Sequence, residues 1–150
     1  MDKIDSPFLG ELEIDEDKVI TLPHGMIGFS DYKRYLLLED GEAPFWYLQS
    51  LDDEKLFFIL VNPLRFFTDY KVEIEKDNLS DIELNSPEEG AVLCPVTIPE
   101  AGVEKATANL QGPVIINTAK RLAMQVVLYP SDYSTKHPLF NEAKKASGDG

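Results

Sequence analysis

Short apolar runs limit this chain to a small set of folds. The runs span four to eight residues, and Pro, Gly, Asp and Asn separate them. Several runs alternate apolar and polar residues, which is the period of a β-strand, whereas the 3.6-residue period of an amphipathic helix hardly appears. The connections are too short for the helical crossovers that parallel strands need. The pattern therefore predicts an all-β fold with one short helix, arranged as a compact antiparallel β-barrel-like single domain.

The expected strands lie between turn residues, and one short helix is expected over 77–84, after an Asp or Asn cap. The segment 52–55 is short enough to join two strands in a hairpin, and Gly25 and Gly28 suit a loop with positive φ. Pro95 predicts an edge strand or a bulge, because proline cannot donate to a ladder. The last three strands are expected to form an antiparallel meander. The predicted strands cover 8–14, 18–22, 35–39, 45–51, 56–61, 70–74, 91–98, 107–110, 114–117 and 121–128.

Residues 1–140 are predicted to form the domain, and the small, polar segment 141–150 a disordered C-terminal tail. A chain of this length folds without a disulfide or a metal, and the single cysteine, Cys94, excludes an intramolecular disulfide. The N-terminus lacks the features of a signal peptide, and no run approaches the roughly 20 apolar residues of a membrane span. We therefore expect a cytoplasmic protein that is monomeric on its own.

Acidic residues outnumber basic ones: 27 Asp and Glu against 14 Lys and Arg give a formal net charge of -13 at pH 7. This charge repels phosphate backbones and anionic membranes, and the basic residues form only isolated pairs, so direct binding to nucleic acid or membrane is not expected. The same charge attracts a basic protein partner. Taken by itself, the acidity is explained more simply by solubility.

No catalytic, metal or cofactor site is predicted. His24 and His137 lie far apart in the sequence, and neither has a second metal ligand at the spacing of a zinc site. Cys94 lies in an apolar run and is expected to be a buried structural residue. The sequence contains none of the glycine-rich nucleotide-binding or hydrolase motifs. No residue is therefore singled out as catalytic.

A set of aromatic, glycine and amide residues near turns remains. Taken one at a time, each is explained more simply by core packing or by turn structure. They occur in a fixed order: His24–Phe29, Phe45–Ser50, Asn62–Pro63, Phe66–Tyr70, Thr107–Asn117, Arg121–Leu128, Tyr133 and His137–Leu139. The order and spacing of these segments resemble those of the FliW family of bacterial flagellar assembly factors. The resemblance covers nearly all of the chain except its last ten or so residues.

The resemblance implies a protein with two protein partners and no enzymatic activity. The partners are CsrA, an RNA-binding translational repressor, and flagellin. FliW proteins hold CsrA off the flagellin messenger until newly made flagellin captures FliW and frees CsrA. An acidic surface suits a basic RNA-binding partner. The sequence leaves open whether FliW covers the RNA site or acts from elsewhere on CsrA, and family precedent favours the second.

The contact residues follow from chemical character at the resembling positions. Flagellin has helix-forming terminal segments, and an amphipathic helix needs an apolar groove, for which we expect Trp46, Phe66, Phe67 and Tyr70. For CsrA we expect acidic and amide side chains, namely Asp69, Glu73, Asn109, Gln111 and Asn117.

Two alternatives remain open. Most of these residues can instead shape the barrel without touching a partner. The protein can also be a small-ligand-binding β-barrel, an unrecognised enzyme or an acidic interaction module unrelated to flagella. A deep pocket lined by His24 or His137 with a carboxylate would favour the small ligand, whereas a filled interior with exposed aromatic residues would favour a protein partner.

Overall fold

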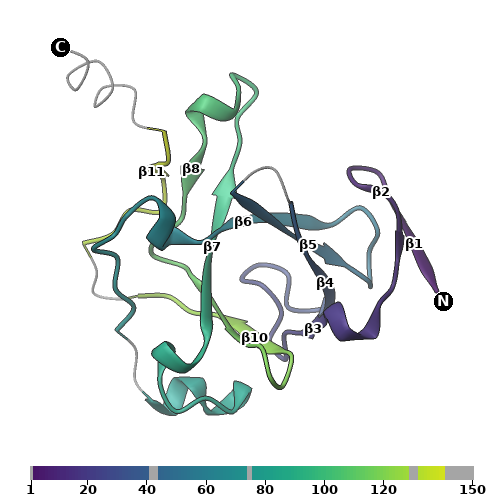
Figure 1. The fold of residues 1–150 in the computed structure, drawn as a ribbon, viewed down its shortest axis with the longest axis horizontal. Coiled ribbons are helices and arrows are strands. Elements are labelled where there is room, and N and C mark those ends of the chain that lie inside the picture. Colours follow the sequence, from purple (N-terminus) through teal and green to yellow (C-terminus); the bar gives the residue numbers. More distant parts are fainter. Residues whose placement is uncertain (1, 41–43, 74–75, 129–131, 141–150) are drawn as a thin grey trace.

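A ring of strands closes on itself in the computed structural model, which describes residues 2–40, 44–73, 76–128 and 132–140. Within these residues seven strands follow one another around the ring in the order β7, β6, β5, β4, β3, β10, β9, and β9 pairs back onto β7 (Figure 1). The ring strands are β3 (Val19–Thr21), β4 (Arg34–Glu39), β5 (Phe45–Ser50), β6 (Phe57–Val61), β7 (Ala91–Thr97), β9 (Val114–Asn117) and β10 (Leu122–Gln125).

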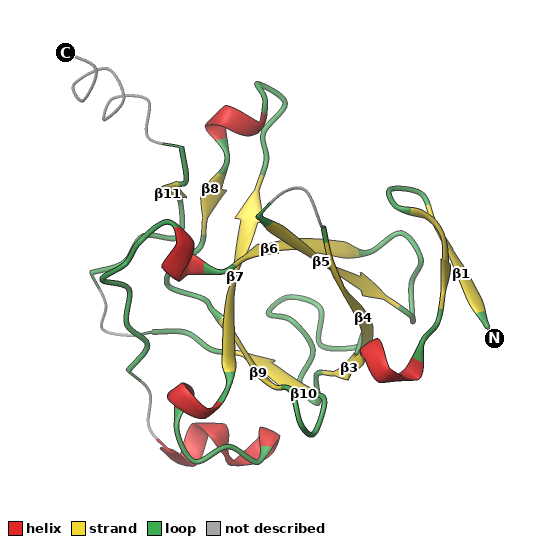
Figure 2. Ribbon diagram, in the orientation of Figure 1, coloured by secondary structure: helices red, strands yellow, loops and turns green. Residues whose placement is uncertain are grey.

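Neighbouring ring strands are antiparallel except β3 and β10, which meet in parallel at Thr21 and Leu122. Two short strands, β8 (Thr107–Ala108) and β11 (His137–Pro138), extend the sheet outward from β7. The first two strands, β1 (Lys3–Ser6) and β2 (Gly10–Glu13), form a separate hairpin beside the ring (Figure 2). The all-β barrel predicted from the sequence is confirmed.

Five short 3-10 helices lie among the described connections. They are η1 (Glu16–Lys18), η2 (Pro63–Arg65), η3 (Lys76–Ile82), η4 (Pro87–Glu89) and η5 (Val103–Lys105). The helix expected over 77–84 lies at η3, but it is a 3-10 helix that ends at Ile82, with Glu83 at a positive φ of 61°. The tail predicted for 141–150 lies outside the described residues.

Alternate residues of the ring strands point inward and fill the barrel. The inner cluster takes residues from every ring strand, namely Ile20, Tyr35, Leu48, Leu60, Leu93, Val114, Ile116 and Ala123, together with Leu22 and Met26. The residues between them point outward into a second cluster, where η3 and the last part of the domain cover the barrel wall. This division is the period-2 pattern of a barrel strand, and it explains why both faces of several strands are apolar.

The strand predicted over 70–74 is wrong for the residues that the structure describes. Tyr70 is buried and Val72 is half-buried, so the segment shows the alternation of a strand. However, the Tyr70 hydroxyl donates to the carbonyl of Leu110 at 2.7 Å, and the Lys71 amide donates to the Tyr133 hydroxyl at 2.9 Å. The Tyr70 amide donates to the Phe67 carbonyl at 3.0 Å, so a local turn and a tyrosine hydroxyl take the place of a neighbouring strand at these two residues.

The edge strand predicted from Pro95 is also wrong, because β7 lies between β6 on one side and β8 and β9 on the other. Pro95 occupies the gap on that second side, after the β9 ladder ends at Leu93 and before the β8 ladder begins at Val96. The Pro95 carbonyl accepts from the Asn109 amide at 2.8 Å, so its missing N–H faces this gap. The antiparallel meander predicted for the last three strands is confirmed for β9 and β10, which pair with each other. It is wrong for β8, which pairs with β7 and β11 and not with β9.

Two glycines shape the loop before β4, and they give a matched test. Gly25 (φ +67°) and Gly28 (φ +91°) both have left-handed backbones. A Cβ at Gly25 would clash with the Phe29 carbonyl oxygen, whereas a Cβ at Gly28 has nothing within 4 Å. We expect Gly28→Ala to lower the free energy of unfolding by about 1–2 kcal/mol. Gly25→Ala adds a backbone clash and is expected to cost about 3 kcal/mol or more. Urea denaturation measures both, and equal losses would contradict this account.

Candidate functional site: an apolar groove at one end of the barrel

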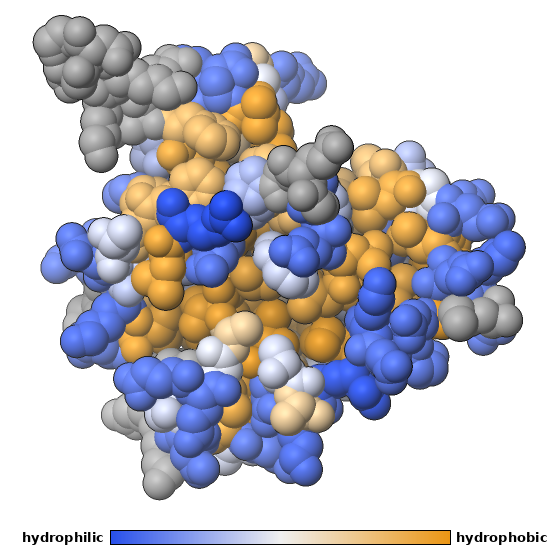
Figure 3. Space-filling view, viewed as in Figure 1, coloured by the Kyte–Doolittle hydropathy of each residue, from blue (hydrophilic) through white to orange (hydrophobic). Residues whose placement is uncertain are grey.

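A groove of about 610 Å³ opens at one end of the barrel and continues over the start of β7. Figure 3 shows apolar residues gathered in the hollow centre of this face, with hydrophilic residues around them. The polar residues of the groove are Asn62, Lys71, Glu88 and Thr118. Its apolar lining consists of Leu37, Trp46, Pro63, Leu64, Tyr70, Val72, Ala91, Val92, Leu93 and Ile116.

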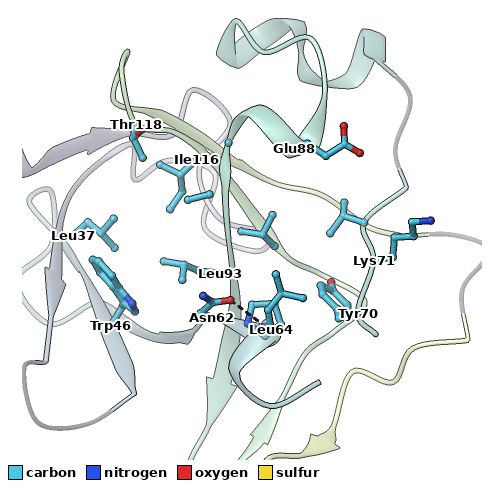
Figure 4. Close-up of a pocket in the computed structure, with 15 residues that line it drawn as sticks. Leu37, Trp46, Asn62, Leu64, Tyr70, Lys71, Glu88, Leu93, Ile116 and Thr118 are labelled. Carbon is cyan, nitrogen blue, oxygen red and sulfur yellow. Dashed lines mark hydrogen bonds between the residues drawn. The ribbon is translucent and has the colours of Figure 1, made fainter. Parts of the chain in front are cut away.

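One half of the groove is the mouth of the filled barrel. Leu93 on β7 and Ile116 on β9 belong to the inner cluster. Leu37 on β4 and Trp46 on β5 pack against it, and these side chains lie together in Figure 4. Trp46 is half-buried, so part of its ring faces the groove. A half-exposed tryptophan beside aliphatic side chains is typical of a protein-binding site.

The other half is built by η2 and the segment that follows it. Pro63 begins η2, and the Asn62 side chain accepts a hydrogen bond from the Leu64 amide at 3.0 Å. This cap fixes a turn that leaves Leu64 53% exposed over the groove. Lys71 and Glu88 lie at the far rim (Figure 4).

Tyr70 anchors the groove wall to the barrel. Its side chain is 8% exposed, its hydroxyl donates to Leu110 at 2.7 Å, and the Cys94 thiol lies 3.7 Å from that hydroxyl. Burial, and after it the neighbouring Cys94, raises the pKa of Tyr70 well above its usual value. Burial also raises the pKa of the Cys94 thiol to about 12. Cys94 is therefore the buried structural cysteine that the sequence predicts.

These shifts predict a loss of stability in alkali. A folded-state pKa above the unfolded one means that the folded chain holds its proton more tightly, so stability is full below the unfolded pKa and falls as the pH rises toward the folded pKa. For Cys94 the fall begins near pH 9, with a slope approaching about 1.4 kcal/mol per pH unit. In Cys94→Ala we expect the fall to begin about one unit later, where tyrosines ionise in the unfolded chain while burial still holds the pKa values of Tyr70 and Tyr35 higher in the folded chain. Urea titrations between pH 7 and 11 measure this, and identical curves would contradict it.

The structure brings two of the four predicted aromatic residues, Trp46 and Tyr70, into one groove. Phe66 and Phe67 are half-buried and line another part of the surface. Phe67 packs edge-on against His137 with ring centroids 4.5 Å apart, and Phe66 packs against Phe140 at 5.8 Å. This pair fixes the C-terminal strand β11 against the barrel.

The predicted acidic residues are neighbours in sequence of residues that line the groove. Asp69 and Glu73 are both exposed, and they bracket the segment 70–72 that lines the groove. Neither carboxylate lines the groove itself.

Two of the three predicted amides, Asn109 and Asn117, hold backbone turns. Asn117 is 6% exposed, and its side chain donates to the Ile82 carbonyl at 2.8 Å and accepts from the Lys120 amide at 3.2 Å. The Asn109 side chain accepts from the Gln111 amide at 3.0 Å, and both residues are half-buried. A partner contact for these three amides stays a prediction.

The features that would favour a small ligand do not meet in this groove. Neither His24 nor His137 lines it. His24 lies 2.7 Å from Asp81, but both side chains are more than half exposed. Among the described residues, no three His, Cys, Asp or Glu side chains gather as metal ligands do. No helix in the described part of the chain is both long and apolar enough to cross a membrane.

Leu64 is the most exposed of the large apolar groove residues that the sequence analysis does not single out. A partial signal was present, because Asn62 and Pro63 predict a capped turn and Leu64 follows them directly. Leu37 and Ile116 were indistinguishable from other strand residues, because their place at the open end depends on how the ring closes.

A filled barrel, an apolar groove at its mouth and a strongly acidic chain define a small β-barrel of the protein-binding class. A family model described as FliW protein matches residues 3–139. The chain is 55% identical over 148 residues to the flagellar assembly factor FliW of Natranaerobius thermophilus, covering 97% of this chain and 98% of that one. It is 41% identical over 144 residues to that of Treponema denticola, covering 96% and 97%.

Structural comparison agrees with these matches. A crystal structure of the flagellar assembly factor FliW superposes with a TM-score of 0.86 at 34% identity, covering 94% of this chain and 99% of that chain. The chain belongs to the FliW family, and its function is that of a flagellar assembly factor.

Proposed function

We propose that this protein acts in the cytoplasm as a partner switch that binds CsrA and flagellin in turn. Bound to this protein, CsrA is kept from repressing translation of the flagellin messenger. Newly made flagellin then binds this protein in place of CsrA, and the released CsrA returns to the messenger. The apolar groove at the barrel mouth is the observation that carries this proposal, because it offers an amphipathic helix the surface it needs.

Flagellin is the partner proposed for the groove. A helix laid across it would bury apolar side chains between Trp46 on one wall and Leu64 on the other. Tyr70 closes this surface as a wall of the groove, whereas Phe66 and Phe67, which pack on Phe140 and His137 outside it, stay proposed contacts for a longer flagellin segment.

CsrA is the partner proposed for the acidic residues beside the groove. Asp69 and Glu73 attract a basic RNA-binding protein, and the amides Asn109, Gln111 and Asn117 are the proposed polar contacts. Because Asp69 and Glu73 bracket the groove-lining segment, a helix in the groove lies beside both carboxylates. This arrangement gives flagellin a physical route to displace CsrA, whether the effect on RNA is direct or through repulsion by the acidic chain.

The dependence of CsrA binding on salt tests the electrostatic part of this proposal. With a net charge of -13 on this chain, the dissociation constant for CsrA is expected to rise about tenfold or more between 50 and 500 mM salt. Calorimetric titration at four salt concentrations measures it. A dissociation constant that does not change with salt would remove charge as the basis of recognition.

A further inference from the structure

The hairpin of β1 and β2 is a two-stranded sheet with unpaired outer edges. Within the described residues neither strand pairs with any strand except its partner. The hairpin lies beside the ring in Figure 1, and at its turn Phe8 stacks on Phe57 of β6 with ring centroids 4.3 Å apart. An unpaired strand edge presents N–H and C=O groups to which another extended chain can add itself as a strand.

The register shows which residues form these edges. Lys3 lies opposite Glu13, Ile4 opposite Leu12 and Asp5 opposite Glu11. The Ile14 amide donates to the Asp2 carbonyl at 2.7 Å, so that pair is hydrogen-bonded across the hairpin. Hydrogen-bonded pairs alternate along an antiparallel ladder, so Ile4 and Leu12 also point their backbone groups inward. The outward N–H and C=O groups therefore belong to Lys3 and Asp5 on β1 and to Glu11 and Glu13 on β2.

The two faces of the hairpin differ in chemistry. Asp5, Glu11 and Glu13 share one face with Lys3 and are all exposed, and the Lys3 ammonium is already engaged by Glu11 at 3.3 Å. Ile4 and Leu12 share the opposite face and are half-exposed. A strand added at either edge would place its alternate side chains over these two faces.

We infer that the β1–β2 hairpin is a docking site for an extended polypeptide segment in which basic and apolar residues alternate. The basic side chains pair with Asp5, Glu11 and Glu13, and the apolar ones extend the Ile4 and Leu12 face. A second copy of this chain is a poor occupant, because its own edge would bring like charges together. This site is separate from the groove and does not depend on the proposed function.

Amide hydrogen exchange of the full chain tests this inference with a defined probe. The probe is a blocked octapeptide in which lysine alternates with valine, and the control peptide has glutamate in place of lysine. At saturating lysine peptide, the outward amides of one edge, Lys3 and Asp5 or Glu11 and Glu13, are expected to exchange about tenfold more slowly. The Ile4 and Leu12 amides, already paired across the hairpin, should not change.

A matched pair of variants separates the hairpin from general charge. Asp5→Asn with Glu13→Gln removes two acids from the hairpin, and Asp31→Asn with Glu54→Gln removes two exposed acids elsewhere. The first variant should lose the protection and the second should keep it. Equal protection by the glutamate peptide, unchanged protection in the hairpin variant, or no slowing at any outward amide would each overturn the inference.

Discussion

Replacing Leu64 by aspartate is expected to weaken flagellin binding about 30-fold or more while the domain stays folded. Leu64 is 53% exposed over the groove, so an exposed carboxylate adds little strain to the free protein. In the complex the same carboxylate would be buried against an apolar helix without a partner, a loss of at least about 2 kcal/mol. Calorimetric titration with flagellin measures the change.

Val127→Asp is the matched control for this variant. Val127 is 59% exposed and does not line the groove, so the same substitution there places a carboxylate on open surface. It is expected to leave flagellin affinity within about twofold of the unsubstituted protein. Equal effects of the two substitutions, or full affinity in Leu64→Asp, would show that flagellin does not bind in the groove.

Reversing the charges of Asp69 and Glu73 is expected to slow association with CsrA about tenfold at low salt. Each change from acid to lysine adds two charges, so the double variant moves the net charge by four, from -13 to -9. Charges that steer an encounter act mainly on the association rate, so the dissociation rate should change less. Stopped-flow or surface-based kinetics measures both rates.

A second double variant serves as the control, because it has the same net charge as the first but carries its substitutions in other parts of the chain. Asp31 precedes β4 and Glu54 lies in the turn between β5 and β6, and both are exposed. If Asp69 and Glu73 form the contact, Asp31→Lys with Glu54→Lys will slow association much less. Equal slowing would mean that CsrA responds to the whole chain's charge and that the contact lies elsewhere.

The sequence predicts the fold class well because short alternating runs are a local property. β5 and β6 carry a hairpin signal in the four polar residues between them, and the structure pairs Trp46 with Leu60 and Gln49 with Phe57 as that hairpin requires. The pairings that close the barrel, β3 with β10 and β7 with β9, join segments far apart in the chain. No local pattern specifies such pairings.

Alternation was misleading where a segment is extended but not paired. Residues 70–73 show the burial pattern of a strand because Tyr70 and Val72 pack on the outer cluster, yet a tyrosine hydroxyl takes the place of a ladder partner. The candidate site shows the same limit. Trp46 and Tyr70 were predicted from their character, but their meeting in one groove with Leu64 depends on the closed ring.

The proposed partner switch requires that CsrA and flagellin alternate on this protein. Its most direct test is a calorimetric titration with CsrA, repeated after the protein has been saturated with flagellin. We expect CsrA to bind in the first titration and not to bind in the second. Full CsrA binding in the presence of saturating flagellin, or no binding of either partner, would contradict it.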